Sequence, residues 1–219
     1  MKKVLILFGI FIGTFIFSQI NVEEIKKNII EDSKKYYYEN LEIFKTDPKI
    51  LTQEQLNYIY YGNNFVDYGY NRIEFNKKLG AVTKFANRKI SKKLAKKILK
   101  DALNLYEINP INKEILLDLV NIYDSLEEHS KSELHELQYQ LLIETIRDSG
   151  TGKLEEYPIV VTNISDQMMA VEKFSNIFTH GIDFESKVLP DGSWLNIYKN
   201  GLNLYFVKTI HHKDMFGDD

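Results

Sequence analysis

The sequence predicts an α+β protein in which helical hairpins come first and a small antiparallel β meander with one short helix follows. Apolar residues recur at the i, i+3 and i+4 spacing of helices as far as Ser149. Beyond the glycine-rich joint at 150–152 the apolar spacing changes to alternation, which is typical of half-buried strands. Two hairpin-turn motifs, at 190–192 and 200–201, then punctuate this alternation. The predicted organisation is a signal peptide over 1–18, a helical domain over 19–149 and a small α+β region over 150–219 that packs on the helices.

The N-terminal segment predicts export. Lys2 and Lys3 precede an uncharged apolar run over residues 4–17, and Ser18 and Gln19 open a polar chain. A basic start, an apolar stretch and an exit of small residues are the parts of a secretory signal peptide. The run is shorter than the roughly 20 residues that a membrane span needs, so we expect cleavage after Ser18 and no transmembrane segment in the mature chain. The expected location is the periplasm or the extracellular space.

Two helices are expected before residue 63. Asn21 is a candidate N-cap, and its helix is expected to continue through the tyrosines at 36–38 as far as Asp47-Pro48. Thr52 with Gln55 has the spacing of a capping box, which opens a second helix that Gly62 ends. The segment 63–71 is rich in glycine, asparagine and tyrosine, and it predicts an aromatic surface loop before helical character resumes around 72–85.

A tight helical hairpin follows. Ser91 can cap a helix with an apolar stripe that extends to Tyr106, and Asn109-Pro110 ends it because the residue before proline avoids the helical conformation. Asn112 can cap the next helix, which must pack antiparallel on the first. This helix, Asn-Pro, helix order looks like one tetratricopeptide-type unit, although no second copy occurs at that period.

The third helix of this block is expected to open with the capping box Ser130 to Glu133. Gly150 is expected to end it in the left-handed conformation that glycine adopts readily. Next come a short strand over 157–162 and a short helix capped by Ser165 or Asp166. The three strands of the meander are expected at 182–189, 193–199 and 202–209, with one face on the helices and the other in water.

Several strings along the chain together resemble one family. They are Tyr36-Tyr37-Tyr38 with Leu41 and Phe44, Tyr60-Tyr61-Gly62, Asn109-Pro110, the stretch from Asp148 to Gly152 before a valine-rich strand, and Leu204-Tyr205-Phe206. In this order they resemble the secreted bacterial proteins known as domain of unknown function 4919. The resemblance covers nearly the whole mature chain. It implies an exported protein of helical hairpins with a β-rich end, and it assigns no activity.

Charge is distributed unevenly. Without the signal peptide, 26 basic residues face 31 acidic ones, which disfavours nucleic acid as a partner. The stretch 75–100 nevertheless holds ten basic residues and no acid. Five of its lysines fall opposite an apolar stripe: Lys92, Lys93, Lys96, Lys97 and Lys100. They form either a solvated helix face or a surface for an anionic glycan, lipid or acidic protein.

Aromatic residues around the predicted loop are the other candidate binding surface. They are Tyr58, Tyr61, Phe65, Tyr68 and Tyr70. Tyrosine rings suit protein interfaces and sugar faces because they bury area and keep a hydroxyl in water. Either the loop packs on the helices, or these rings line a binding groove.

The sequence predicts no catalytic residue, metal site or cofactor. The chain has no cysteine, no phosphate-binding Gly-Lys-Ser/Thr motif and no Gly-x-Ser-x-Gly elbow. His129, Glu133 and Glu136 have helical spacing but favour a solvated helix face over a metal site, and Ser149 has no base near it in sequence. We therefore expect a non-catalytic interaction module with an unidentified protein partner. The alternatives are the binding of an anionic glycan or lipid through the aromatic loop and the lysines, and an enzyme with an unfamiliar site.

Overall fold

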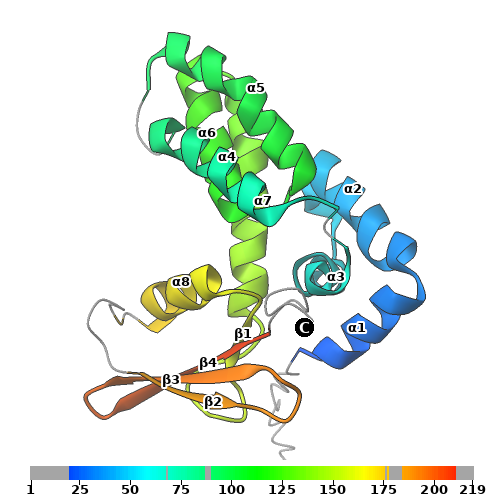
Figure 1. The fold of residues 1–219 in the computed structure, drawn as a ribbon, viewed down its shortest axis with the longest axis vertical. Coiled ribbons are helices and arrows are strands. Elements are labelled where there is room, and N and C mark those ends of the chain that lie inside the picture. The colour runs from blue at the N-terminus through cyan, green and yellow to red at the C-terminus, as the bar shows by residue number, and fades with distance from the viewer. Residues whose placement is uncertain (1–19, 68, 87–89, 176, 178–183, 211–219) are drawn as a thin grey trace, which may run out of the picture.

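The computed structural model describes residues 20–67, 69–86, 90–175, 177 and 184–210. The predicted signal peptide, Tyr68 and the tail 211–219 lie outside the described residues. The helices are α1 (Val22–Glu31), α2 (Glu39–Thr46), α3 (Gln53–Gly62), α4 (Arg72–Ala86), α5 (Lys92–Ile108), α6 (Lys113–Leu126), α7 (His129–Arg147) and α8 (Ile164–Ser175). The strands are β1 (Ile159–Val161), β2 (Phe184–Val188), β3 (Trp194–Asn200) and β4 (Asn203–Thr209). The predicted α+β fold with helices before a small sheet is confirmed (Figure 1).

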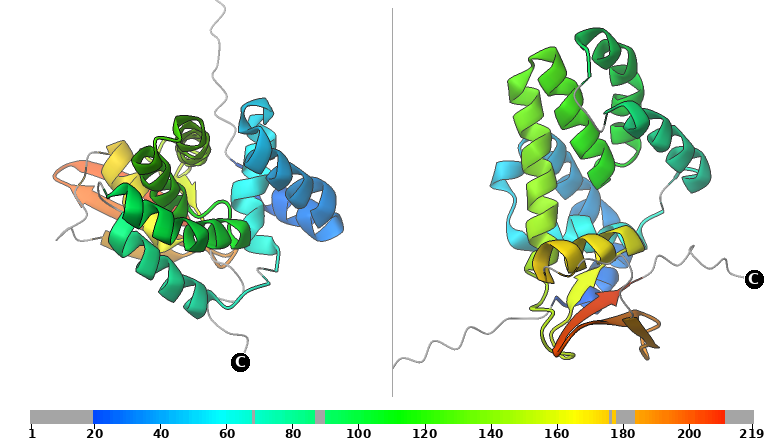
Figure 2. Two further views of the ribbon diagram at one scale, coloured as in Figure 1. Left: turned by 90° about the horizontal axis from the view of Figure 1, so that it is seen from above. Right: turned by 90° about the vertical axis from the view of Figure 1, so that its left-hand side faces the viewer.

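The molecule has a helical body with the sheet at one end. Helices α4 to α7 form a bundle that extends away from the sheet, α1 to α3 lie beside it, and α8 lies across one face of the sheet (Figures 1 and 2). None of the helices in the described part of the chain combines the length and the apolar character needed for a membrane span. The three connections α3–α4, α5–α6 and β1–α8 all contribute to the lining of one cleft.

The capping signals set most helix starts. The side chains of Asn21, Thr52, Ser91 and Asn112 each accept a hydrogen bond from a backbone N–H three residues later, and the Thr52–Gln55 capping box is complete. These bonds satisfy N–H groups that the first turn of a helix leaves without a partner. The expected long first helix is interrupted, because α1 ends at Glu31 and a π-helical turn over Lys34–Tyr38 separates it from α2.

The predicted capping box at Ser130 is wrong. Helix α7 already begins at His129, and Glu128 precedes it without a side-chain cap bond. The reason lies in the preceding turn, where Glu127 takes a left-handed conformation with φ 64° and Glu128 donates its N–H to Tyr123 O at 2.9 Å. This αL cap reverses the chain within two residues, so α7 starts before Ser130.

Two further expectations, about the end of α7 and the start of α8, are corrected. Gly150 does not have a positive φ; the left-handed residue of this joint is Gly152, with φ 66°. Helix α8 is capped by Asn163, whose Oδ1 accepts the N–H of Asp166 at 2.9 Å, and not by Ser165 or Asp166. Asparagine is as good an N-cap as serine or aspartate, so the sequence alone does not choose among three adjacent candidates.

The sheet is mixed. Its order is β1-β4-β3-β2, with the predicted antiparallel meander formed by β2, β3 and β4 and with β1 parallel to β4 at the opposite edge. The chain connects these parallel strands through α8, β2 and β3. The expected burial of one face does not extend to β2, because all five of its residues are exposed. Strand β1, by contrast, is wholly buried.

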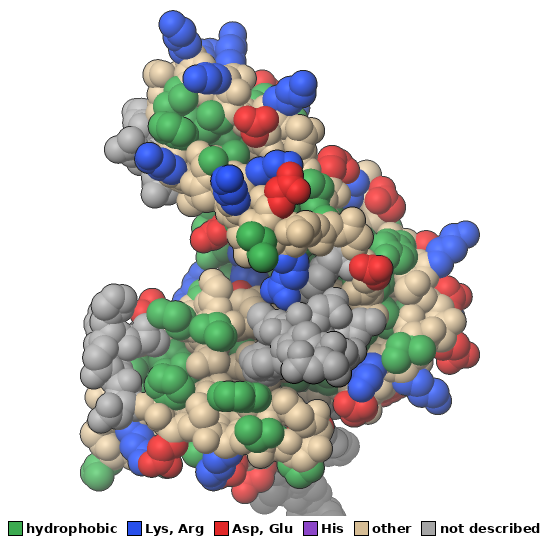
Figure 3. Space-filling model, in the orientation of Figure 1, with side chains coloured by type: hydrophobic (Ala, Val, Ile, Leu, Met, Phe, Trp, Pro, Cys, Tyr) green, Lys and Arg blue, Asp and Glu red, His purple; other side chains and the backbone are tan. Residues whose placement is uncertain are grey.

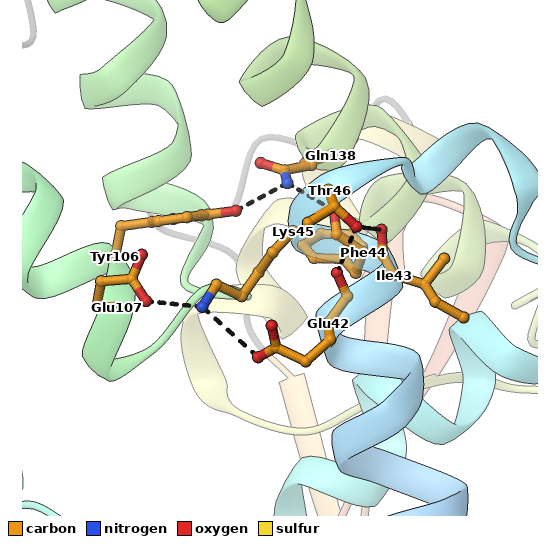
Figure 4. Close-up of polar contacts among 8 residues, drawn as sticks. All are labelled: Glu42, Ile43, Phe44, Lys45, Thr46, Tyr106, Glu107 and Gln138. Carbon is orange, nitrogen blue, oxygen red and sulfur yellow. Dashed lines mark hydrogen bonds and ion pairs between the residues drawn. The ribbon is translucent and has the colours of Figure 1, made fainter.

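The N-terminal helices are joined to the bundle through α7 (Figure 4). The side-chain amide of Gln138 is fully buried and donates to Phe44 O at 2.7 Å and to the Tyr106 hydroxyl at 2.8 Å. Lys45 on α2 makes an ion pair with Glu107 on α5 at 2.7 Å. A single buried amide thus links α2, α5 and α7, because it has two donors for two acceptors.

Asp118 carries a buried carboxyl group whose ionisation opposes folding. It lies on α6, accepts a 2.6 Å hydrogen bond from the Thr83 hydroxyl on α4, and burial raises its pKa to about 6. This pKa is higher than in the unfolded chain, so the folded state favours the protonated carboxyl group. Its contribution to stability is complete below about pH 4, where the group is neutral in both states, and is lost as pH rises through 6. We expect Asp118→Asn to raise the free energy of unfolding at pH 7 by about 2 kcal/mol.

The advantage of Asp118→Asn should shrink as pH falls from 6 to 4, where the wild-type carboxyl becomes neutral as well. Urea unfolding of both chains at several pH values measures this difference. A gain that stays constant with pH would show that the carboxyl group is not the cause.

Candidate functional site

A polar cleft lies where the connecting segments meet. Its volume is about 470 Å³, within the range of ligand sites. Four parts of the chain line it: the end of α3 with the turn after it, the start of α4, the α5–α6 turn with the start of α6, and the β1–α8 turn with the start of α8. Residues far apart in the sequence therefore converge on one hollow.

The lining of the cleft is rich in side-chain amides. Six asparagines contribute to it: Asn63, Asn64, Asn76, Asn109, Asn112 and Asn163. Several also hold the fold, since Asn112 and Asn163 cap α6 and α8 and the buried Asn64 donates to Ile210 O at 3.1 Å. Asn76 is exposed on α4. The donors and acceptors of these carboxamides that are not used within the fold suit a neutral ligand with hydrogen-bonding groups.

A buried ionic network supports one wall of the cleft. Asp166 is buried, and its Oδ1 lies 2.6 Å from Nζ of Lys113, whose side chain is 18% exposed. Its Oδ2 accepts the Tyr60 hydroxyl at 2.5 Å and the Asn163 amide at 2.9 Å. The carboxylate thus has three donors, as a buried charge requires.

The same network joins three elements of the fold. Lys113 is the first residue of α6, Asp166 lies in the first turn of α8, and Tyr60 comes from α3. The Tyr60 hydroxyl also accepts the N–H of Thr162 at 3.3 Å, and Lys113 Nζ lies 5.2 Å from the centre of the Tyr60 ring. The cleft wall is consequently rigid, because each side chain is fixed by at least two contacts.

The polar groups of this wall are bonded within the protein. Burial, followed by the nearby Asp166 charge, holds the pKa of Tyr60 well above its usual value, so the phenol stays protonated. Both oxygens of Asp166 accept from donors within the protein, and Lys113 balances its charge. Within the described ranges, no three His, Cys, Asp or Glu side chains are placed to hold a metal ion. Ser149 is buried, with its hydroxyl bonded to Ile146 O at 2.7 Å.

The predicted aromatic surface is corrected by the structure. Tyr61 is fully buried and donates to Val160 O at 3.1 Å, and Tyr58 is buried and bonded to Asn28 at 2.6 Å. Neither ring can line a groove because both belong to the core. Phe65 is half-buried against that core, whereas Tyr70 is half-buried, lines the cleft and accepts a 3.0 Å bond from Asn109. Tyr68 lies outside the described residues.

The five predicted lysines lie together on the outer face of α5 and are all exposed. Lys92 forms a 3.0 Å ion pair with Glu127. The others extend from the lobe of the bundle that lies farthest from the sheet, where basic side chains gather (Figure 3). This surface and the cleft are formed by different parts of the bundle.

Sequence reasoning missed the residues that form the cleft wall. Lys113 comes directly after the cap Asn112, and Asp166 comes three residues after the cap Asn163. Nothing in the local sequence shows that the starts of these two helices meet. The frequency of asparagine in the turns at 63–64, 109–112 and 163 is the one signal that could have indicated a polar site.

Comparison with known proteins gives one match. A scan against protein families matches the family described as Domain of unknown function (DUF4919) over residues 23–204. Searches of curated proteins and of solved structures give no significant match. The matched segment contains all four parts of the chain that line the cleft. The chain belongs to the DUF4919 family.

Proposed function

We propose that the mature chain is a non-catalytic protein-interaction module, exported to the periplasm or the cell exterior, whose cleft binds a short extended segment of a partner protein. The tetratricopeptide-like α5–α6 hairpin positions one wall of this site. The observation that carries the proposal is the convergence of six asparagine side chains on one cleft. A side-chain carboxamide has the same donor and acceptor groups as a peptide bond. The exposed amide of Asn76, together with the carboxamide groups that the caps and internal bonds leave over, can therefore pair with an extended backbone.

The charges of the cleft support a neutral segment. The Lys113–Asp166 pair is neutral as a unit, and its charges are used within the protein. The remaining charged lining residues are one cation and one anion, Arg72 and Glu114. A volume of about 470 Å³ fits a few residues of a peptide better than a folded surface.

Peptide selection from a random displayed library tests this function. We expect wild-type mature protein to enrich peptides that are polar and uncharged at their centre. Asn76→Leu and Ser165→Trp change exposed lining residues and should weaken the selected peptides at least tenfold, because the first removes an amide and the second fills the cleft. Lys93→Ala, on the outer face of α5, is the matched control and should bind as the wild type does.

Failure to enrich any peptide, or equal binding by the cleft variants and the control, would contradict the proposal. The thermal unfolding of each variant should be compared first, because a lower affinity counts only for a chain that is folded.

A second candidate function rests on the division of charge. Residues 72–108 hold eleven of the 28 basic residues but only three of the 31 acidic ones. On α4 and α5 six exposed lysines of this stretch have no ion pair with any described residue; this basic face consists of Lys77, Lys84, Lys93, Lys96, Lys97 and Lys100. We propose that the basic face binds an anionic glycan or lipid, since each lysine near an anionic surface contributes about 1 kcal/mol.

This alternative predicts binding to anionic vesicles or to a sulfated glycan matrix that disappears at high salt. The double substitution Lys93→Glu with Lys97→Glu should abolish it, whereas Asn76→Leu should leave it unchanged. Binding that persists at high salt would show that the charges of the basic face do not cause it.

A further inference from the structure

The outer edge of the sheet offers a second interaction surface, which is independent of the cleft. Strand β2 is the terminal strand of the described sheet and pairs on one side only, with β3 (Figure 1). Phe184 and Val188, its first and last residues, are 52% and 68% exposed. An exposed edge strand with apolar side chains is a template for pairing with another strand.

The backbone of this edge has a defined pattern. Leu189 donates its N–H to Ser193 O at 2.8 Å, next to the Val188–Trp194 pair of the β2–β3 ladder. Hydrogen-bonded and non-hydrogen-bonded pairs alternate in an antiparallel ladder, so Glu185 and Lys187 also bond to β3. The N–H and C=O groups of Phe184, Ser186 and Val188 therefore point away from the sheet.

The side chains of β2 make this edge complementary to itself. If two copies of β2 pair antiparallel about Ser186, the outward groups of Phe184 meet those of Val188 in the second copy. In the same register each Glu185, which also pairs with Lys199 of its own chain, lies opposite the Lys187 of the other copy, which also pairs with Glu155 of its own chain. The next possible register is shifted by two residues, because a shift by one would place the outward N–H and C=O groups of one strand opposite inward groups of the other. A shift by two places Glu185 opposite Glu185 or Lys187 opposite Lys187. Like charges directly opposite each other are unfavourable, so one register is selected.

We propose that the protein forms a twofold-symmetric dimer in which β2 pairs antiparallel with β2 of a second copy, centred on Ser186. The two four-stranded sheets then become one continuous sheet. The dimer covers Phe184 and Val188 at both ends of the new ladder and adds three pairs of hydrogen-bonded residues. The occupant is a second copy because the sequence Phe-Glu-Ser-Lys-Val is charge-complementary to its own reverse.

Charge substitutions test the register. Sedimentation velocity of the mature chain, over a range of concentrations, should show a monomer–dimer equilibrium. Glu185→Lys should weaken the dimer about tenfold, because each twofold pairing then has two lysine–lysine contacts. Adding Lys187→Glu to that variant should restore dimerisation, since opposite charges again face each other. A wild-type chain that stays monomeric at every concentration, or a double variant no better than the single one, would overturn the proposal.

Backbone substitutions test the strand pairing separately. Ser186→Pro removes an outward N–H and should abolish the dimer while leaving the β2–β3 ladder in place. Ser186→Ala is the matched control: like the proline variant it loses the side-chain bond to Asn196, but it keeps the outward N–H and should dimerise as the wild type does. If both variants dimerise equally, the interface is not formed by β2. Circular dichroism of both variants confirms that each monomer is folded.

Discussion

Asp166→Ala is expected to lower the free energy of unfolding by about 3 to 5 kcal/mol, the range for removing one partner of a buried ion pair. The substitution leaves the Lys113 ammonium without its counter-ion and the Tyr60 hydroxyl without its acceptor. It also separates the starts of α6 and α8, which are joined through this carboxylate. Urea unfolding at pH 7 measures the loss.

The cause can be separated from the loss of packing. Asp166→Asn keeps the size of the side chain and an acceptor for Tyr60, so it should cost less than the alanine variant. Adding Lys113→Met to Asp166→Ala removes the unpaired charge and should recover part of the stability. A loss below about 1 kcal/mol for Asp166→Ala would show that the pair is solvated like a surface ion pair.

Gly150→Ala is expected to destabilise the protein by about 3 kcal/mol or more, because there is no space for a methyl group. A Cβ at this position would lie 2.0 Å from Pro158 O, which is a backbone atom and cannot rotate away. To relieve the contact, the loop after α7 must move and loosen the bonds that Thr151 and Gly152 donate to Tyr157 O, at 3.1 and 2.9 Å.

Gly80→Ala is the matched control for this substitution. Gly80 lies within α4, and a Cβ there would meet no atom within 4 Å. Alanine has the higher helix propensity, so Gly80→Ala should raise the stability by about 0.5 to 1 kcal/mol. Thermal unfolding of both variants should therefore give shifts of opposite sign. Equal shifts would mean that the close approach at Gly150 is relieved at little cost.

The sequence predicted the elements well where local chemistry determines them. The caps at Asn21, Thr52, Ser91 and Asn112 use a side chain and an N–H three residues apart, so the signal and its cause lie in the same few residues. The change from helical spacing to alternation after Gly152 likewise placed the sheet after the helices. The helix stop at Asn109-Pro110 follows from proline geometry alone.

The rest depends on contacts between distant residues. Gly150 is predicted to be left-handed because glycine often ends helices, but in the structure it is needed for the close approach of Pro158 O. Tyr58 and Tyr61 are predicted to surround an exposed loop, because a tyrosine hydroxyl is usually in contact with water. In the structure both rings are buried, and each hydroxyl has a hydrogen-bond partner in the protein instead of water. The cleft is less predictable still, because the contact between Lys113 and Asp166 is set by how α6 and α8 pack.

The parallel pairing of β1 with β4 also constrains how the protein is made. Strand β1 is wholly buried, and its only strand partner in the described sheet is β4, the last of the described strands. Ile159, Val160 and Val161 therefore have no edge to join until residue 209 has emerged from the ribosome. Domains whose contacts lie far apart in sequence fold late and slowly. In a nascent chain β1 stays without its strand partner until β4 has been made, and a truncation before β4 leaves an apolar strand unpaired.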